Sequence, residues 1–325
     1  MEVLMHVSQF SEEWNSIPDI RLITPDDPSW PGRMRPLSGM PKRLYYIGSL
    51  PRDDLPSVGI IGSRLCSPYG HKTAAEFGRI LAQAGIQIIS GMAVGVDGYA
   101  QEGALEARGL SFAVLGSGAD VCYPHKNGHL YRRLCRQGGV LSELKPGTKP
   151  YGPYFAARNR IISALSDILL VVEAKMKSGT NITVDFALAQ GKTVFAVPGR
   201  VGDHLSDGCN YLISQGAGIA YSPKAILDEL KLPSFCSFEA ACRMKEEAEK
   251  RLEKSVLEDP SLDPSCKAVF RELSEQDPLT ADALSQKLNL PARVVLSSLT
   301  SLILSGYAEE PVRGKYTKAS SPLYQ

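Results

Sequence analysis

Long apolar runs are missing from this chain. None of its apolar stretches approaches the roughly 18 residues that a membrane-spanning helix needs. The first residues, MEVLMHVSQFSEEW, also lack the basic start and the apolar stretch of a secretory signal. Both absences argue against a membrane partner and predict a cytoplasmic protein.

Cysteine patterns that hold metals or build disulfide frameworks are missing too. The seven cysteines form no Cys-x-x-Cys pair and no Cys/His cluster with zinc spacing. We therefore expect buried thiols in a reducing compartment, with no metal and no cofactor.

An excess of charge of one sign is also missing, because 36 lysines and arginines face 35 aspartates and glutamates. The distribution is uneven, however, since residues 120–200 hold 12 basic residues and only five acids. A basic half on a neutral chain is typical of a surface that binds a polyanion. The alternative interpretation is that these lysines and arginines only solvate helix surfaces.

What the chain does contain is one construction repeated between Ser57 and Ala220, in which a short apolar strand, a glycine-rich turn and a helix follow one another. Continuous apolar runs are typical of strands covered on both faces. The pattern therefore predicts an α/β fold with an extended, Rossmann-like, doubly wound and mostly parallel sheet. Helices are expected at 69–84 and 181–190. The expected strands are 58–61, 86–89, 111–115, 168–173 and 193–197, with weaker ones near 139–143 and 218–220.

The composition divides the rest of the chain. Residues 1–56 are predicted to be an N-terminal appendage and a proline-rich lead-in, whose LYYIG segment (44–48) adds a strand to the sheet edge. Residues 57–237 form the Rossmann-like domain. Residues 238–260 form a highly charged linker.

Residues 261–325 predict a small winged-helix-like domain. A helix near 264–274, a helix with Thr280 as its N-cap and a third helix at 291–305 precede two short strands around a glycine. The third helix carries one basic residue, Arg293, whereas a groove-reading helix normally offers several donors. A protein contact, a stabilising role and a weak DNA contact therefore all stay open for this domain.

The glycine-rich turns supply candidate phosphate contacts. In a parallel sheet every strand-to-helix turn lies at the carboxyl edge, where helix N-termini attract anions. The candidates in the first three turns are Gly62, Ser63, Arg64, Ser90, Gly91 and Gly116. The SGT turn adds Ser178, Gly179 and Thr180, with Lys175 just ahead of it. The alternative for each is an ordinary strand-to-helix turn.

A further cluster joins two arginines and an amide. Arg158, Asn159 and Arg160 are expected at the start of a helix, where they would clamp a phosphate. The alternative is that either arginine pairs with Asp167 or Glu173.

Neither a catalytic residue nor a nicotinamide site is predicted. Asp97 lies near a helix start without a partner acid, which favours capping of the helix over catalysis. The GSGAD turn (116–120) is followed by Val121 where the third glycine of a dinucleotide fingerprint belongs.

Together these motifs resemble one known family. GSR with SPYG, SGMAVGVDGYAQEGAL, LGSGADVCYP, SELKPGTKPYGPYFAARNRIISALSD, VVEAKMKSGT, VFAVPG and LSDGCNYLI occur in order. The sequence resembles the DNA-processing protein A (DprA, also called Smf) family over about residues 21–225. The resemblance implies a homodimeric protein that binds single-stranded DNA, protects incoming DNA and loads the RecA recombinase in natural transformation.

The resemblance also implies which residues contact the DNA backbone. Arg64 matches the arginine of the family's GSR motif. The lysine expected after YP is replaced by His125, with Lys126 following it, and Lys149 is the nearest substitute for a later family lysine. Gln101 stands where the family's A-H-x-G-A-L pattern has histidine.

The leading hypothesis is a non-enzymatic single-strand binder. The alternative is a nucleotide phosphoribohydrolase of the lysine-decarboxylase-like family, which acts on nucleoside monophosphates through a P-G-G-x-G-T-x-x-E loop. Only Gly179 and Thr180 persist from that loop, and Thr183 stands in place of the catalytic glutamate. Because glycosidic cleavage needs that acid, the binder is favoured.

Overall fold

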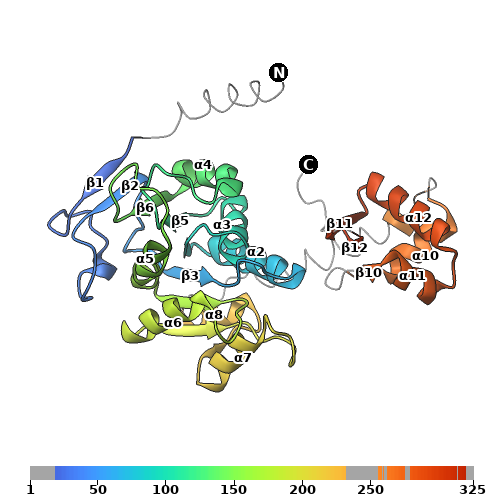
Figure 1. Cartoon of the computed structure of the whole chain (residues 1–325). Coiled ribbons are helices and arrows are strands. Elements are labelled where there is room, and N and C mark those ends of the chain that lie inside the picture. The colour runs from blue at the N-terminus through green and yellow to red at the C-terminus, as the bar shows by residue number, and fades with distance from the viewer. Residues whose placement is uncertain are drawn as a thin grey trace. The chain divides into compact units, whose positions relative to one another are not determined.

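The structure is a computed structural model that describes residues 19–231, 255–257, 259, 262–274, 279–312 and 314–319. The chain divides into two compact units, Met1–Ser234 and Phe235–Gln325 (Figure 1). Of the predicted domain boundaries, those at 237 and 260 lie outside the described residues. All of these boundaries stay predictions.

The first unit is built on a nine-stranded sheet with the order β1-β2-β6-β5-β4-β3-β7-β8-β9. Strands β3 to β9 pair in parallel, and helices cover both faces, so the doubly wound Rossmann-like fold is confirmed. The parallel strands are β3 (Ser57–Ile61), β4 (Gln87–Ser90), β5 (Ser111–Val114), β6 (Gly139–Ser142), β7 (Ile168–Val171), β8 (Thr193–Ala196) and β9 (Gly218–Ile219). The helices are α2 (Pro68–Gln83), α3 (Val96–Glu106), η2 (His125–Asn127), α4 (Gly128–Gln137), α5 (Gly152–Ala164), α6 (Gly179–Ala189), α7 (Asp207–Ser214) and α8 (Pro223–Glu229).

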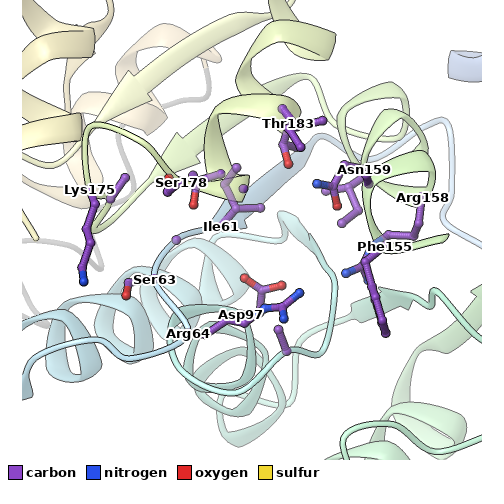
Figure 2. A pocket seen from close by; sticks show the side chains of 18 of the residues that line it. Ile61, Ser63, Arg64, Asp97, Phe155, Arg158, Asn159, Lys175, Ser178 and Thr183 are labelled. Atoms are coloured by element: carbon purple, nitrogen blue, oxygen red, sulfur yellow. The ribbon is translucent and has the colours of Figure 1, made fainter. Parts of the chain in front are cut away.

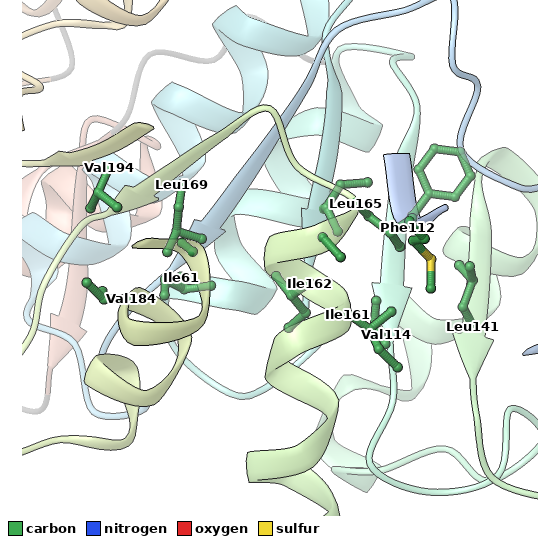
Figure 3. Packing of buried hydrophobic residues seen from close by; sticks show 14 of the residues in the cluster. Ile61, Phe112, Val114, Leu141, Ile161, Ile162, Leu165, Leu169, Val184 and Val194 are labelled. Atoms are coloured by element: carbon green, nitrogen blue, oxygen red, sulfur yellow. The ribbon is translucent and has the colours of Figure 1, made fainter. Parts of the chain in front are cut away.

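Two hydrophobic layers hold the helices to the sheet. Alternate residues of each strand face opposite sides, so Ile61 and Leu169 pack with α5 and α6 (Figure 3), whereas Ile60 and Leu170 pack with α2 and α3. All residues of β3, β4 and β7 are buried. This two-sided burial explains why the strands read as continuous apolar runs in the sequence.

Helices α2 and α3 lie unusually close together. A Cβ on Gly78 would come 2.0 Å from the Ala100 carbonyl oxygen, and one on Gly103 would come 2.1 Å from that of Ala75. Only glycine permits this approach of two helix backbones.

The lead-in adds two strands to one end of the sheet, where the sequence predicted one. β2 (Leu44–Gly48) pairs antiparallel with β6, and β1 (Arg21–Ile23) pairs antiparallel with β2. Between them lie the short helix η1 (Gly32–Met34) and the buried Trp30.

One arginine of η1 holds the lead-in to the parallel part of the sheet. Arg33 donates from Nε and Nη2 to the two carboxylate oxygens of Asp167, both at 2.9 Å. It also donates to the carbonyl oxygens of Arg52 at 2.9 Å and Leu55 at 2.6 Å. Asp167 in turn accepts the backbone N–H of Ser57 at 2.8 Å, so the contact reaches the start of β3.

The described part of the second unit contains a small antiparallel sheet with the order β10-β12-β11. Strand β10 lies between the helices Pro264–Glu272 and Ala281–Leu288, and β11 and β12 follow the helix Ala292–Leu304. Thr280 accepts the Ala283 N–H at 3.2 Å, which confirms the predicted N-cap. Strand β10 was not predicted, and the winged-helix assignment stays a prediction. The elements are α10 (Pro264–Glu272), β10 (Leu279–Thr280), α11 (Ala281–Leu288), α12 (Ala292–Leu304), β11 (Ala308–Val312) and β12 (Lys315–Lys318). In the described part of the chain, no helix combines the length and apolar character needed to cross a membrane.

Candidate nucleic-acid interface

The site lies where the strand order of the sheet reverses. Strands β4, β5 and β6 follow β3 on one side, whereas β7, β8 and β9 lie on its other side. The helices after β3 and β7 pack on opposite faces, so a crevice opens between these two strands at the carboxyl edge, where doubly wound sheets bind ligands. A pocket of about 460 Å³ occupies this place (Figure 2).

Three of the segments that line this pocket bring together most of the predicted phosphate contacts, and Ala93 and Asp97 form a fourth segment after β4. The residues are Gly62, Ser63 and Arg64 after β3, Phe155, Arg158 and Asn159 on α5, and Lys175, Ser178, Gly179 and Thr180 around the start of α6. Arg64, Arg158 and Lys175 therefore line one pocket.

The loop that carries Arg64 is fixed by its neighbours. The backbone N–H of Ser63 donates to the Glu173 carbonyl at 2.7 Å, and the Ser63 carbonyl accepts the Val96 N–H at 3.2 Å. Gly95 has a φ of +83°, and a Cβ there would lie 2.3 Å from the Ser63 carbonyl oxygen. Only glycine fits this contact, which holds Arg64 exposed at the pocket rim.

The rim offers positive charge that no described residue neutralises. Arg64 and Lys175 are both exposed, and neither forms a salt bridge with another described residue. Ser178 precedes α6 without capping it, so the first N–H groups of this helix stay open at the Gly179 end. Two free cations beside an uncapped helix N-terminus form an anion site.

The floor of the pocket is a buried arginine. Arg158 is 5% exposed, and its Nη1 donates to the carbonyl oxygens of Gly91, at 2.8 Å, and Val114. Its buried Nε has no hydrogen-bond partner in the part of the chain that the structure describes. Burial lowers the pKa of Arg158 to about 10, against the opposing charge of Asp97. Arg158 therefore holds the backbone at Gly91 and Val114 and also contributes positive charge to the pocket lining.

Asp97 completes this floor. Its carboxylate lies in the first turn of α3 and accepts the Gly91 N–H at 3.1 Å. Burial raises the pKa of Asp97, although the charge of Arg158 opposes this effect. Asp97 and Arg158 thus hold the Gly91 backbone from its N–H and its carbonyl. Asp97 lies near the helix start as predicted, but its carboxylate binds the turn after β4 in place of capping the helix.

Two other predicted contacts lie behind the pocket. Ser90 is buried and donates from Oγ to the Ile60 carbonyl at 2.6 Å. Gly116 packs directly against Phe155, and a Cβ at this position would lie only 2.6 Å from the Phe155 ring. Ser90 and Gly116 therefore shape the site from beneath, as Gly91 does.

Arg158 and Arg160 do not act as one clamp. Helix α5 begins at Gly152, with Pro153 in its first turn, so both arginines lie in the middle of the helix. The predicted position at a helix start is therefore wrong. Two residues along a helix turn by about 200°, so these side chains leave α5 on different sides.

Arg160 is neutralised away from the pocket. Its Nη1 and Nη2 donate to Glu143 at 3.0 and 2.7 Å, and its Nε donates to the Gly39 carbonyl at 2.9 Å. The alternative pairing with Asp167 or Glu173 is therefore wrong for Arg160. The sequence could not indicate Glu143, because this acid arrives from the end of β6.

Lys126 and Lys149 are both exposed and lie outside the pocket lining. Lys126 follows β5 within η2, and Lys149 follows β6 ahead of α5. Both positions lie beyond the ends of parallel strands, on the edge that carries the pocket.

Gln101, where the resemblance implies a histidine, is buried. Its Oε1 accepts the Met92 N–H at 3.1 Å, and its Nε2 donates to the Phe112 carbonyl at 3.0 Å. Gln101 therefore holds the turn after β4, and it does not line the pocket.

The described pocket lining holds no carboxylate placed for glycosidic cleavage. Thr183 lines it where the hydrolase would carry its glutamate, and Asp97 is engaged by Gly91. Burial raises the pKa of Glu173, but this acid accepts the Ser67 hydroxyl at 2.5 Å and N–H at 2.9 Å and lies outside the lining. Among the described residues, no group of three or more His, Cys, Asp or Glu side chains could hold a metal ion.

Sequence reasoning missed Phe155, whose ring lies in the pocket with the guanidinium carbon of Arg64 5.6 Å from its centroid. A signal was present, because an aromatic three residues before Arg158 shares its helix face.

Comparison with known proteins decides the family. Residues 21–231 match the family described as DNA recombination-mediator protein A. The chain belongs to this family. DNA processing protein DprA of Streptococcus pneumoniae is 38% identical over 224 residues, which are 69% of this chain and 78% of that protein. Protein Smf of Escherichia coli is 39% identical over 219 residues, or 67% of this chain and 59% of that protein.

Two solved DprA structures share the fold. The crystal structure from Streptococcus pneumoniae superposes with a TM-score of 0.61 at 37% identity, covering 68% of this chain and 77% of that one. DNA processing protein A from Helicobacter pylori, described as having a unique single-stranded DNA binding mode, superposes with a TM-score of 0.60 at 31% identity. The match covers 66% of this chain and 96% of that chain. The DprA family mediates recombination and is not an enzyme family. The chain spans little more than half of its Escherichia coli and Synechocystis relatives, at 59% and 56%.

Proposed function

We propose that this chain binds single-stranded DNA along the carboxyl edge of its sheet. The observation that carries the proposal is the pocket at the strand-order reversal, where Arg64 and Lys175 lie unpaired beside the open N-terminus of α6. Its family and the DNA-binding DprA from Helicobacter pylori support the same function.

The pocket holds the strand by its backbone. The Arg64 guanidinium forks onto one phosphate, while Lys175 and the N–H groups at Gly179 contact another. Lys126 and Lys149 meet phosphates beyond the pocket. Because these contacts ignore base identity, binding is independent of sequence.

Salt titration of oligo-dT binding, followed by fluorescence anisotropy, tests this proposal. If four or five phosphates are neutralised on a single strand, the log–log slope is about −3. We expect Arg64→Ala to lower the affinity by about tenfold or more, since it removes a charge-assisted contact. The same change makes the slope shallower by about 0.7.

Arg108→Ala is the matched control. Arg108 is also exposed, but it lies between α3 and β5, at the amino edge of the sheet. Its loss leaves the affinity unchanged. An affinity insensitive to salt, or an Arg64→Ala protein that binds like the parent, would refute the proposal.

The remaining role rests on the family. We propose a cytoplasmic homodimer that protects incoming single strands and loads the RecA recombinase onto them in natural transformation. Light scattering should give twice the chain mass of 35.2 kDa. Purified chain should also speed RecA assembly on DNA that is already covered by single-strand-binding protein. A monomeric mass would contradict the proposed homodimer. An unchanged rate of RecA assembly would contradict the proposed loading of RecA.

A further inference from the structure

A row of aromatic rings continues outward from the pocket. The ring centroid of Phe155, a pocket residue, lies 5.6 Å from that of Tyr123, with the planes 35° apart. Tyr123 in turn lies 6.4 Å from His125, with planes 77° apart. Tyr123 is 40% exposed, and His125 is exposed as well.

This row points along the sheet edge. Tyr123 and His125 belong to the segment after β5, which is two strands from β3 and therefore about 10 Å from it. Lys126 follows directly and is exposed. The rings thus connect the cations of the pocket with a cation farther along the same edge.

The fold does not depend on these two side chains. Other residues secure the segment: Tyr131 donates to the Ala119 carbonyl at 2.7 Å and Asn127 to that of Met92 at 3.0 Å. Cys122 fills the core beneath it. Tyr123 belongs to none of the buried clusters of the first unit.

We propose that Tyr123 and His125 form a base-stacking step for a single strand leaving the pocket. The ligand is a nucleobase of any identity, because every base offers a π-face, and Lys126 contacts the phosphate of the same nucleotide. This inference rests on the proposed function and adds the direction of the strand, from Arg64 past Phe155 toward β5.

The test compares two strands of equal length, oligo-dT and a strand of abasic sites, which share phosphates and differ in bases. Tyr123→Ala should weaken oligo-dT binding by about fivefold or more and leave abasic binding unchanged. Tyr123→Phe should keep the parent affinity, and His125→Ala should also weaken oligo-dT binding alone. The salt slope of Tyr123→Ala should stay that of the parent, because no charge is lost.

Tyr211→Ala is the control, since this tyrosine is similarly exposed, at 49%, and lies on α7 outside the row. It should bind both strands like the parent. If Tyr123→Ala lowered the affinity for both strands equally, Tyr123 would have a structural role. If it lowered the affinity for neither strand, the aromatic row would not contact DNA. Either result overturns the inference. If the parent itself failed to bind oligo-dT, the proposed function would fail instead.

Discussion

Arg158 and Asp97 are opposite charges buried beneath the pocket, and each depends on the other. Arg158→Met leaves the Asp97 carboxylate uncompensated in a buried place, so we expect the unfolding free energy to fall by about 3 kcal/mol. Adding Asp97→Asn removes that charge while keeping an acceptor for the Gly91 N–H. Urea denaturation of the single and double variants measures the recovery.

The double variant should be more stable than Arg158→Met alone. Additive losses would mean that the two groups act independently and would contradict the paired floor. Because Arg64 stays at the rim, oligo-dT binding should be weakened by the double variant less than by Arg64→Ala.

The positions of the rim residues could be predicted from the sequence because they are local, whereas their contact with phosphate stays a prediction. Gly62, Ser63 and Arg64 follow a strand directly, and the SGT turn opens a helix, so each site position depends on a few neighbouring residues. The roles of Arg158 and Arg160 depend on partners far along the chain. Burial under Gly91 and pairing with Glu143 are therefore visible only in the fold.

At the scale of elements, the contact between Arg33 and Asp167 attaches the lead-in to the parallel sheet. Burial raises the pKa of Asp167, but the hydrogen bonds from Arg33 and Ser57 outweigh it and lower the pKa below its usual 3.8. The stability from this pair is therefore present above that usual value and is lost as the pH falls through the lowered pKa.

We expect Arg33→Met to lower the unfolding free energy by about 2 kcal/mol near neutral pH, because it breaks a largely buried network. The loss should shrink below about pH 3.8, where Asp167 takes up its proton. Urea unfolding midpoints across pH check this. Arg52→Ala removes the exposed pair with Asp54 and should change nothing measurable. A pH-independent loss in Arg33→Met would contradict the assignment.

Element positions were largely predictable, and their pairing was less so. The central strands lie within about two residues of their predicted bounds, because buried parallel strands are continuous apolar runs. β1 was missed, because a strand of three residues is too short to show an alternation of apolar and polar side chains. Its position is set by its pairing with β2. The start of α5 at Gly152 was missed, although proline, here Pro153, is favoured in a first helical turn.

At the scale of the whole molecule, the two units have separate cores. Phe270, Leu284 and Leu299 pack within the second unit, and none of its described residues enters the clusters of the first. The exposed side of α12 carries Leu296 and Leu304, with Arg293 as its one cation. This surface offers little to a phosphate backbone.

A chain truncated after Ser234 should therefore unfold as one cooperative transition and bind oligo-dT within about twofold of the full chain. Differential scanning calorimetry of both proteins, with anisotropy, provides the measurement. A tenfold loss of affinity on truncation would mean that the second unit contacts DNA.

The strand order on which the pocket depends could not be predicted from the sequence, because hydrophobic patterns do not specify which strands are neighbours.

The tight contact between Gly95 and the Ser63 carbonyl has a consequence for genetics. A side chain at Gly95 would displace the neighbouring loop and carry Arg64 away from its place, although Gly95 itself offers no group to a nucleic acid. Screens for recombination-defective alleles should therefore recover changes at Gly95 alongside those at Arg64, and the two would share one phenotype for different reasons.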